Sequence, residues 1–571
     1  MEKIIPKQLI IAIALLQGLL LLALYKSIQY KFWPSTDEVS LNVAMSLVIS
    51  LPVMAMLSAW SDNLRDLSKW LALFGLCLAL VAAYTGYQQK PATIIHSFNL
   101  LAPFALTVGI ACFKALLYIQ QRASNEPVSY NALFRLSWRN FLILGLATIF
   151  CAIFWGILML LAGLFESIKI KFFIYTFTQA WFYFPAISIA GGVAIFIFRN
   201  MTSVIDMIAK LLQALIKYLL PLVIFVALLF LAALLTSGLE LLWKTGTGSI
   251  MVLWLLAIIL FFVNTVYQDK SDIIPYSLAL HRFIYIGIAV LPLYVLIAAY
   301  GLYLRISQYG WSLGRCWGVL VCSLLALFIF GYVWGIIKKR DAWIGTLSQV
   351  NIVMSIVVLV SAILINSPLL DFRKIVVSSQ MARIESGKNT LSNLDIYYFS
   401  RNLARPGYLA LQSLKTKIKD TNPQLAKGID AVYTRQTTVQ HDITAKALRA
   451  RMTTSPTNLN IPPELMQLLL KQANTSRHYS AVNKHYYLIQ VDLDGAAPAE
   501  YIALEDHVQH GGYARLWYQV GKSWKSIYMT NKGRWPDEKL KALVENKQFS
   551  TLSPRWQRFK IGNIIFSAND E

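Results

Sequence analysis

The sequence predicts a membrane-embedded all-α helical bundle of about eleven transmembrane helices, followed by a soluble α+β domain. Apolar runs of about twenty residues recur from residue 8 to residue 366, and a helix of that length crosses the ~30 Å hydrocarbon layer of a bilayer. Only 14% of the 571 residues are charged, whereas a soluble protein has about a quarter. Beyond Pro368 the sequence becomes polar, with helical and then strand-like periodicity.

The predicted transmembrane helices are separated by short polar gaps. They cover residues 8–25, 41–60, 69–87, 97–119, 141–165, 181–198, 218–236, 250–267, 284–304, 314–337 and 349–366. Pro185, Gly191 and Gly192 interrupt the sixth run. The first run is too long for a signal peptide and lacks a small-residue cleavage site, so we expect it to remain as a helix.

The polar part of the chain divides into a helical region and a strand-rich region. Residues 371–450 have helical periodicity, in which Gly387 and Pro406-Gly407 mark breaks, and 454–465 has the composition of a linker. From residue 485 apolar and polar residues alternate, which predicts three or four short antiparallel strands. The expected domains are a transmembrane domain at 1–366, a helical neck at 367–455 and a small α+β unit with antiparallel strands at 456–571.

Charge distribution predicts the orientation and the partners. Lys and Arg are about twice as frequent in the loops on the N-terminal side of the membrane as in the opposite loops, which favours a cytoplasmic N-terminus. An odd number of helices then places residues 367–571 on the outer side of the membrane. The net charge of +23 suits anionic lipid headgroups. Because no nucleic-acid-binding motif accompanies this charge, we expect membrane lipids as partners and no nucleic acid.

The sequence contains no recognisable catalytic motif. GxSxG, Walker A, HExxH and a GxGxxG after a strand are all missing. The five cysteines are scattered through the apolar part without CxxC spacing, which is typical of small core residues. We therefore expect no cofactor and do not favour an enzyme.

Two short segments of the strand-rich region resemble metal sites. Asp492, Asp494 and Glu500 in VDLDGAAPAE have part of the spacing of a calcium loop, but Ala496 stands where a further oxygen ligand is needed. His507 and His510 lie three residues apart before two glycines, which is more typical of a polar hairpin loop than of zinc ligation. We predict no bound metal at either segment.

A polar stripe follows one face of the helix predicted before residue 218. Asp206, Lys210, Gln213 and Lys217 recur at helical spacing among apolar residues. An interfacial helix with its basic face toward the headgroups explains this pattern. The alternative is that the stripe faces a hydrated cavity, because charge inside a membrane is costly unless it is used.

The loop RISQYGWSLGR at 305–315 carries two arginines on the predicted outer side, where basic residues are otherwise infrequent. Guanidinium groups bind phosphate in a bidentate manner, so Arg305 and Arg315, with Gln308, are candidates for a phosphate or headgroup site. The alternative is that the arginines cap helix ends or pair with acidic side chains. Asn264 and Asn351, within apolar runs, are expected to form hydrogen bonds between helices.

Several segments in register resemble the DUF4153 family of bacterial multi-pass membrane proteins. They are LFRLSWRN (133–140), TSGLELLWKTG (236–246), FFVNTVYQD (261–269), YGLYLRISQYGWSLGR (300–315), SQVNIVMS (348–355) and INSPLLDFRKIVVSSQMARIESGK (365–388). The resemblance runs from about residue 130 to residue 400. It implies a bacterial cytoplasmic membrane protein with a soluble C-terminal region, and it implies no assigned reaction.

Two functional hypotheses follow. The first is a protein of envelope maintenance that transports or handles a membrane-associated substrate, which requires a cavity among the helices. The second is a non-catalytic scaffold or sensor whose residues 367–571 bind envelope proteins, which requires a binding patch on the soluble domain.

Overall fold

The protein is described from a computed structural model. The structure describes residues 5–571 except for 93, 96–97, 125–126, 241–246, 269–274, 392–393, 438–443, 458, 476–484, 494, 496, 507–512, 522, 530–539, 551–558, 562–563 and 567–571. The chain forms two compact units, Met1–Tyr433 and Thr434–Glu571.

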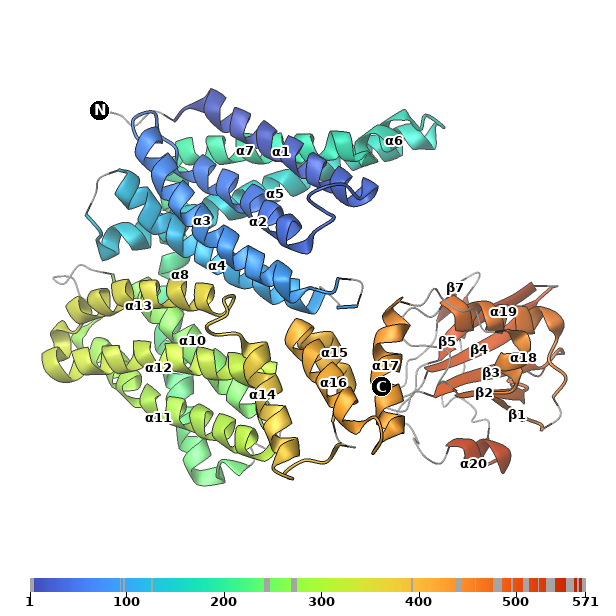
Figure 1. Ribbon diagram of the computed structural model, residues 1–571. Helices are drawn as coiled ribbons and strands as arrows, with labels where there is room; N and C mark the ends of the chain where they lie inside the picture. Colours follow the sequence, from blue (N-terminus) through green and yellow to red (C-terminus); the bar gives the residue numbers. More distant parts are fainter. Residues whose placement is uncertain are drawn as a thin grey trace. The chain divides into compact units, whose positions relative to one another are not determined.

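The first unit is built from helices (Figure 1). The N-terminal helices are α1 (Lys7–Tyr30), α2 (Glu38–Ser58), α3 (Leu64–Gln88), α4 (Phe98–Ala123), α5 (Tyr130–Ser167), α6 (Phe172–Thr178) and α7 (Ala180–Asn200). They are followed by α8 (Thr202–Ser237), α10 (Gly248–Val266), α11 (Leu278–Tyr309), α12 (Leu313–Lys339), the short 3-10 helix η1 (Arg340–Ala342) and α13 (Ile344–Leu364). The last helices of the unit are α14 (Phe372–Glu385), α15 (Ile396–Asn402), α16 (Ala404–Ile418) and α17 (Pro423–Thr437).

Eleven helices of the described part are long and apolar enough to cross a membrane, which confirms the predicted fold class. Two of them begin more than ten residues before their predicted apolar runs. Helix α5 begins at Tyr130 rather than at residue 141, and α8 begins at Thr202 rather than at residue 218. The first turns of these helices contain Arg and Lys, which lower the hydropathy but are good helix formers, so the helix continues where the apolar run does not.

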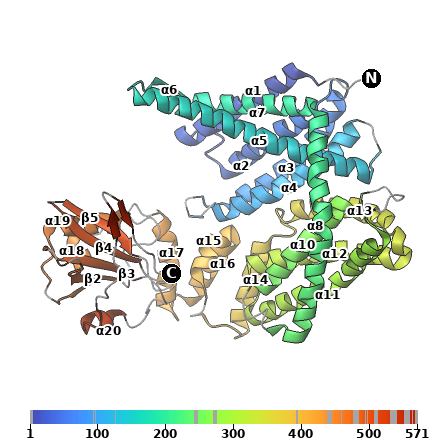
Figure 2. The same cartoon turned by 180° about the vertical axis from the view of Figure 1, so that it is seen from behind.

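Two clusters of buried apolar residues form the core of the membrane helices. The first cluster includes Met56 on α2, Ile143 on α5 and Ala194 on α7. The second cluster draws on α8 and α10–α13. Helix α8 joins them, because Ile205 packs in the first cluster and Ile224 in the second. Figure 2 shows α8 as one long helix that runs from the side of α5 to the side of α10 and α11.

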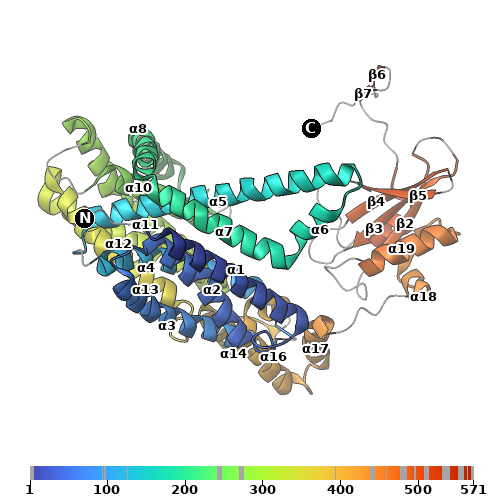
Figure 3. The ribbon, with the colours of Figure 1, turned by 90° about the horizontal axis from the view of Figure 1, so that it is seen from above.

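Helices α1 and α7 approach each other so closely that glycine is required at the contact. A Cβ atom on Gly192 would lie 2.5 Å from Cβ of Ala14, and one on Gly18 would lie 2.7 Å from Cα of Pro185. The run that Pro185 and the glycines interrupt in sequence is therefore a continuous helix whose small residues form the contact, as is common between membrane helices. Figure 3 shows α7 beside α1, and α6 connecting α7 to the end of α5.

A polar network joins three helices inside the second cluster. The Tyr332 hydroxyl donates to Oδ1 of Asn264 at 2.8 Å and also contacts Oδ1 of Asn351. Nδ2 of Asn351 donates to Oδ1 of Asn264 at 2.6 Å. The interhelical role predicted for the two asparagines is thus confirmed, and the network links α10, α12 and α13.

The helices predicted as a neck pack on the membrane helices. Val376 of α14, Phe399 of α15 and Leu411 of α16 share a buried cluster with Cys316 of α12 and Ile365 after α13. The predicted break at Pro406-Gly407 lies slightly earlier in the chain. Helix α15 ends at Asn402, and Ala404 begins α16 with φ of 46°. Proline is tolerated there because it falls in the first turn of α16.

The second unit contains a five-stranded sheet with the order β1-β2-β3-β4-β5 (Figure 1). Its elements are α18 (Ala445–Arg449), β1 (Met452–Ser455), α19 (Pro463–Thr475), β2 (His485–Val491), β3 (Glu500–Asp506), β4 (Tyr513–Val520), β5 (Ser523–Met529) and α20 (Leu540–Glu545), with a separate pair β6 (Phe559–Ile561) and β7 (Ile564–Phe566). Leu465 of α19, Leu488 of β2 and Trp517 of β4 form its core.

The sheet corrects one expectation. Strands β2 to β5 are antiparallel, as predicted, with Leu488 opposite Ala503 and Leu516 opposite Ile527. However, β1 pairs with β2 in parallel, so the sheet is mixed. The sequence of β1, MTTS, is too short to show alternation, and it overlaps the start of the segment predicted as a linker.

The close approach of α1 and α7 generates a prediction. Gly192→Ala should lower the melting temperature of the purified protein, since overpacking a tight contact costs about 1–3 kcal/mol. Gly156→Ala is the matched control, because nothing lies within 4 Å of a Cβ at that position. Thermal unfolding in detergent measures both variants, and equal melting temperatures would contradict the tight contact.

Candidate functional site

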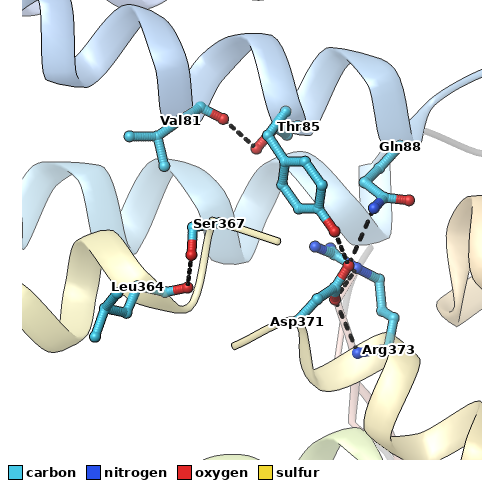
Figure 4. A network of polar contacts seen from close by, with 8 residues as sticks. Val81, Thr85, Gln88, Leu364, Ser367, Asp371 and Arg373 are labelled. Carbon is cyan, nitrogen blue, oxygen red and sulfur yellow. Dashed lines mark hydrogen bonds and ion pairs between the residues drawn. The ribbon is translucent and has the colours of Figure 1, made fainter. Parts of the chain in front are cut away.

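The junction between the membrane helices and α14 is organised around Asp371 (Figure 4). The side chain of Asp371 is fully buried. Its Oδ1 accepts from the backbone N and from Nε of Arg373, both at 2.9 Å. Its Oδ2 accepts from the Tyr84 hydroxyl at 2.8 Å and from Nε2 of Gln88 at 3.1 Å. One carboxylate therefore caps α14 and binds the last turns of α3.

The local sequence explains why the chain folds in this way. Pro368 follows the end of α13 and cannot continue that helix. Asp371 then occupies the N-cap of α14, a position that aspartate favours. Burial of the Asp371 carboxylate is costly unless hydrogen bonds compensate for the lost hydration. Four donors, one of them the Arg373 guanidinium, form these hydrogen bonds.

Side chains of α14 also hold the loop at 305–315. Arg383 donates to the carbonyl oxygens of Ser307 at 3.1 Å and Gln308 at 2.6 Å. Gln380 donates to the carbonyl oxygens of Tyr309 at 3.1 Å and Trp311 at 2.9 Å. The carbonyl groups at the end of α11 would otherwise lack partners, and a guanidinium there also matches the negative end of the helix dipole.

The loop predicted at 305–315 is shorter in the structure, because α11 extends to Tyr309 and α12 begins at Leu313. Arg305 therefore lies in the last turns of α11, and Arg315 lies in the first turn of α12. The guanidinium carbons of Arg305 and Arg315 lie 5.9 Å and 5.4 Å from the centre of the Tyr309 ring. Nη1 of Arg315 donates to the carbonyl oxygen of Gly310 at 2.6 Å. The structure thus brings Arg305 and Arg315 together, whereas Gln308 takes part through its backbone carbonyl oxygen, which accepts from Arg383.

Arg383 is a third guanidinium of this group that sequence reasoning missed. Arg305 and Arg383 both lie close enough to Arg315 for their positive charges to repel the Arg315 guanidinium. Arg315 and Arg383 donate to carbonyl oxygens, and neither forms an ion pair with a described carboxylate. Arg383 is far from Arg305 and Arg315 in the sequence, so their proximity could not be predicted from spacing. The only signal was that Gln380 and Arg383 are three residues apart and therefore share a helix face.

Tyr398 completes the support of the loop from α15. Its hydroxyl oxygen accepts from the backbone N of Leu313 at 2.9 Å. Burial raises the pKa of Tyr398, so the hydroxyl keeps its proton at neutral pH.

A groove of about 790 Å³ follows α14 beside the loop. We call it the basic groove and define it by Trp311, Lys374, Ile375, Ser378, Ser379, Ala382, Arg383, Ser386 and Lys388. Its lining contains three cationic side chains, three serine hydroxyls and no carboxylate. Such a lining suits an anion that accepts several hydrogen bonds, such as a phosphate group.

The polar stripe lies on α8, which runs without a break from Thr202 to Ser237. Gln213 and Lys217 line a cavity of about 290 Å³ together with residues of α10 and the chain after it. Oε1 of Gln213 accepts from Nε2 of Gln268 at 3.1 Å. Asp206 and Lys210 are not part of this lining, so only half of the stripe meets at one cavity.

The carboxylates of the incomplete calcium loop hold backbone turns. Oδ1 of Asp492 accepts from the N of Gly495 at 2.7 Å, and Oε2 of Glu500 accepts from the N of Leu493 at 2.8 Å. Asp494, Ala496, His507 and His510 lie outside the described residues. No group of three or more potential metal ligands occurs in the part of the chain that the structure describes.

Comparison with known proteins identifies the family. The model of DUF4153, a domain of unknown function, matches residues 44–414, which is more than half of the chain. The chain belongs to the DUF4153 family. The matched residues include the loop at 305–315, Asp371 and the basic groove. No curated protein and no solved structure matches this DUF4153 protein.

The buried carboxylate generates a second prediction. Asp371→Asn keeps the N-cap but removes the charge that receives Arg373, and breaking a buried ion pair costs roughly 3 kcal/mol. The variant should melt at lower temperature and expose α14 to protease. Asp395→Asn is the control, since Asp395 caps α15 by accepting from the N of Tyr398 at 2.8 Å while exposed. Equal losses in both variants would show that capping alone explains the effect.

Proposed function

We propose that this DUF4153 protein maintains the bacterial envelope by transporting or handling a membrane-associated substrate that carries a phosphate headgroup. The observation that carries the proposal is the basic groove, with Lys374, Arg383 and Lys388 in one lining of about 790 Å³. Arg305 and Arg315 lie beside the same loop and add positive charge. A phosphate that enters the groove therefore meets cations and hydroxyl donors together.

The position of the groove next to the end of a membrane helix favours a lipid as its ligand over a soluble anion. Trp311 lines it and lies two residues after the end of α11, a helix long and apolar enough to span the membrane. Tryptophan is typical of the headgroup region of a bilayer. The groove would then lie at the level where lipid phosphates lie.

In this proposal the protein resides in the cytoplasmic membrane with its N-terminus in the cytoplasm. The excess of Lys and Arg in the loops on that side supports the orientation. Eleven spans would then place the groove and residues 367–571 in the periplasm.

A second candidate function is a scaffold or sensor that binds envelope proteins through the second unit. Strand β5 lies at the edge of the five-stranded sheet and exposes Ile527 and Tyr528, which are 51% and 70% accessible. Edge strands with apolar side chains can pair with a strand of another protein.

The primary proposal predicts the effect of neutralising the groove. The double variant Lys374→Gln, Lys388→Gln should bind phosphatidylglycerol roughly tenfold to thirtyfold more weakly, since each Lys near a lipid surface contributes about 1 kcal/mol. Titration of the purified protein with short-chain phosphatidylglycerol, followed by native mass spectrometry, measures the affinity.

The matched control is Lys417→Gln, Lys419→Gln, which removes the same charge from exposed positions near the end of α16. It should bind as the unaltered protein does. Competition with inorganic phosphate distinguishes a lipid from a free anion. If the groove variant and the control bind phosphatidylglycerol equally, the groove is not the headgroup site.

A further inference from the structure

A second cavity, of about 660 Å³, lies among the N-terminal membrane helices. Helices α2 and α4 provide most of its lining, with Ile28 of α1 and Leu144 of α5 at the margin. Met45, Val53 and Phe104 are typical of this lining, which is predominantly apolar. A cavity of this size and character suits a hydrophobic ligand.

The lining is not uniformly apolar. Glu38, Asn42, Ser46 and Ser50 recur every four residues and form one face of α2 along the cavity. The lining on α2 extends from Glu38 to Leu57, about 28 Å at 1.5 Å per residue. This distance is close to the ~30 Å thickness of the hydrocarbon layer. A long ligand aligned with the membrane helices would therefore fill it.

One buried donor in this lining has no partner. Gln89 is 3% exposed, and its Nε2 finds no hydrogen-bond acceptor among the residues that the structure describes. An unsatisfied buried amide costs about 1–3 kcal/mol, so an acceptor on a ligand would be favoured there. The preceding residue, Gln88, donates to Asp371, so the hydrogen bond of Gln88 leaves the Gln89 amide available for a ligand.

Glu38 lies at the same end of the cavity as Gln89. Neighbouring charges are already paired, because Nζ of Lys90 lies 2.8 Å from Oδ1 of Asp37. Hydrogen bonds from Lys90 and Ser40 lower the pKa of Asp37 to about 2, so this pair persists at neutral pH. Glu38 lines the cavity and interacts electrostatically with both Asp37 and Lys90, but its carboxylate accepts no hydrogen bond from a described side chain.

We propose that this cavity binds a zwitterionic phospholipid with a primary ammonium headgroup, of the phosphatidylethanolamine class. Nε2 of Gln89 donates to a phosphate or ester oxygen, and Glu38 receives the ammonium group. An acyl chain lies along α2 and α4, against the apolar lining. This site is separate from the basic groove, whose lining shares no residue with it and has no carboxylate.

Headgroup selectivity and two point variants test the proposal. The full-length protein with Lys374→Gln and Lys388→Gln, which weaken lipid binding at the basic groove, is titrated in detergent with phosphatidylethanolamine, phosphatidylcholine and phosphatidylglycerol of identical acyl chains, and bound lipid is counted by native mass spectrometry. Phosphatidylethanolamine should bind best, because the quaternary ammonium of phosphatidylcholine donates no hydrogen bond to Glu38. Gln89→Leu and Glu38→Gln should each weaken phosphatidylethanolamine binding about tenfold.

Gln121→Leu is the matched control for Gln89→Leu. Gln121 is 1% exposed and its amide also finds no partner within the described part of the chain, but it does not line the cavity. This variant should therefore bind as the unaltered protein does. Lys374→Gln, Lys388→Gln should likewise leave phosphatidylethanolamine binding unchanged, which separates this site from the basic groove.

If Gln89→Leu fails to fold, a variant that fills the cavity with a larger side chain tests the proposal instead. Gly109 lines the cavity and no described atom lies within 4 Å of a Cβ built there, so the side chain of Gly109→Leu begins in open space. It should abolish binding, whereas Gly163→Leu, at an open position outside the cavity, should not. Equal binding of all three lipids, or unchanged binding by Gly109→Leu, overturns the proposal.

Discussion

Burying the Asp371 carboxylate is favourable only because Tyr84, Gln88 and Arg373 surround it with donors. This requirement positions α14 against the end of α3. Once α14 is fixed, Arg383 and Gln380 reach the carbonyl groups at the end of α11, and the basic groove, which includes Arg383, forms along α14. The same carboxylate thus organises both the junction and the candidate headgroup site.

The end of α3 also connects the junction with the cavity of about 660 Å³ that we propose binds phospholipid. We call it the lipid cavity. Gln88 donates to Asp371, and Gln89, the next residue, lines the cavity between α2 and α4. A ligand that engages Gln89 would restrict the same helix end that holds α14. The two sites are therefore adjacent along the chain although their linings and their expected ligands differ.

Within the membrane, specificity depends on few polar groups and on close approach. Apolar side chains alone do not distinguish a neighbouring helix from lipid, so small residues and hydrogen bonds select the partners. Gly192 against Ala14 fixes α7 on α1, and the network of Tyr332 with two asparagines fixes α12 between α10 and α13.

Hydropathy and strand alternation were sufficient to predict the fold class, because bilayer thickness and sheet geometry leave a direct periodic signal in the sequence. The early start of α5 and α8 was missed because charged residues lower hydropathy without breaking a helix. Strand β1 was missed because four residues show no period.

The candidate sites were only partly predictable. Arg305 and Arg315 were identified by their unusual position in a short loop, but Lys374 and Arg383 join them only through folding of a helix distant in sequence. The four-residue spacing from Glu38 to Ser50 was present in the sequence as a signal for the lipid cavity. The polar face of α2 becomes a candidate headgroup site only together with Gln89. Gln89 follows α3, so the sequence pattern of α2 gives no indication of it.

Amide hydrogen exchange tests most directly whether Asp371 joins α14 rigidly to the membrane helices. In the full-length protein in lipid nanodiscs, the amides of Phe372–Glu385 should exchange as slowly as those in the second half of Leu64–Gln88. Exchange of α14 within seconds, while the end of α3 remains protected, would contradict the account.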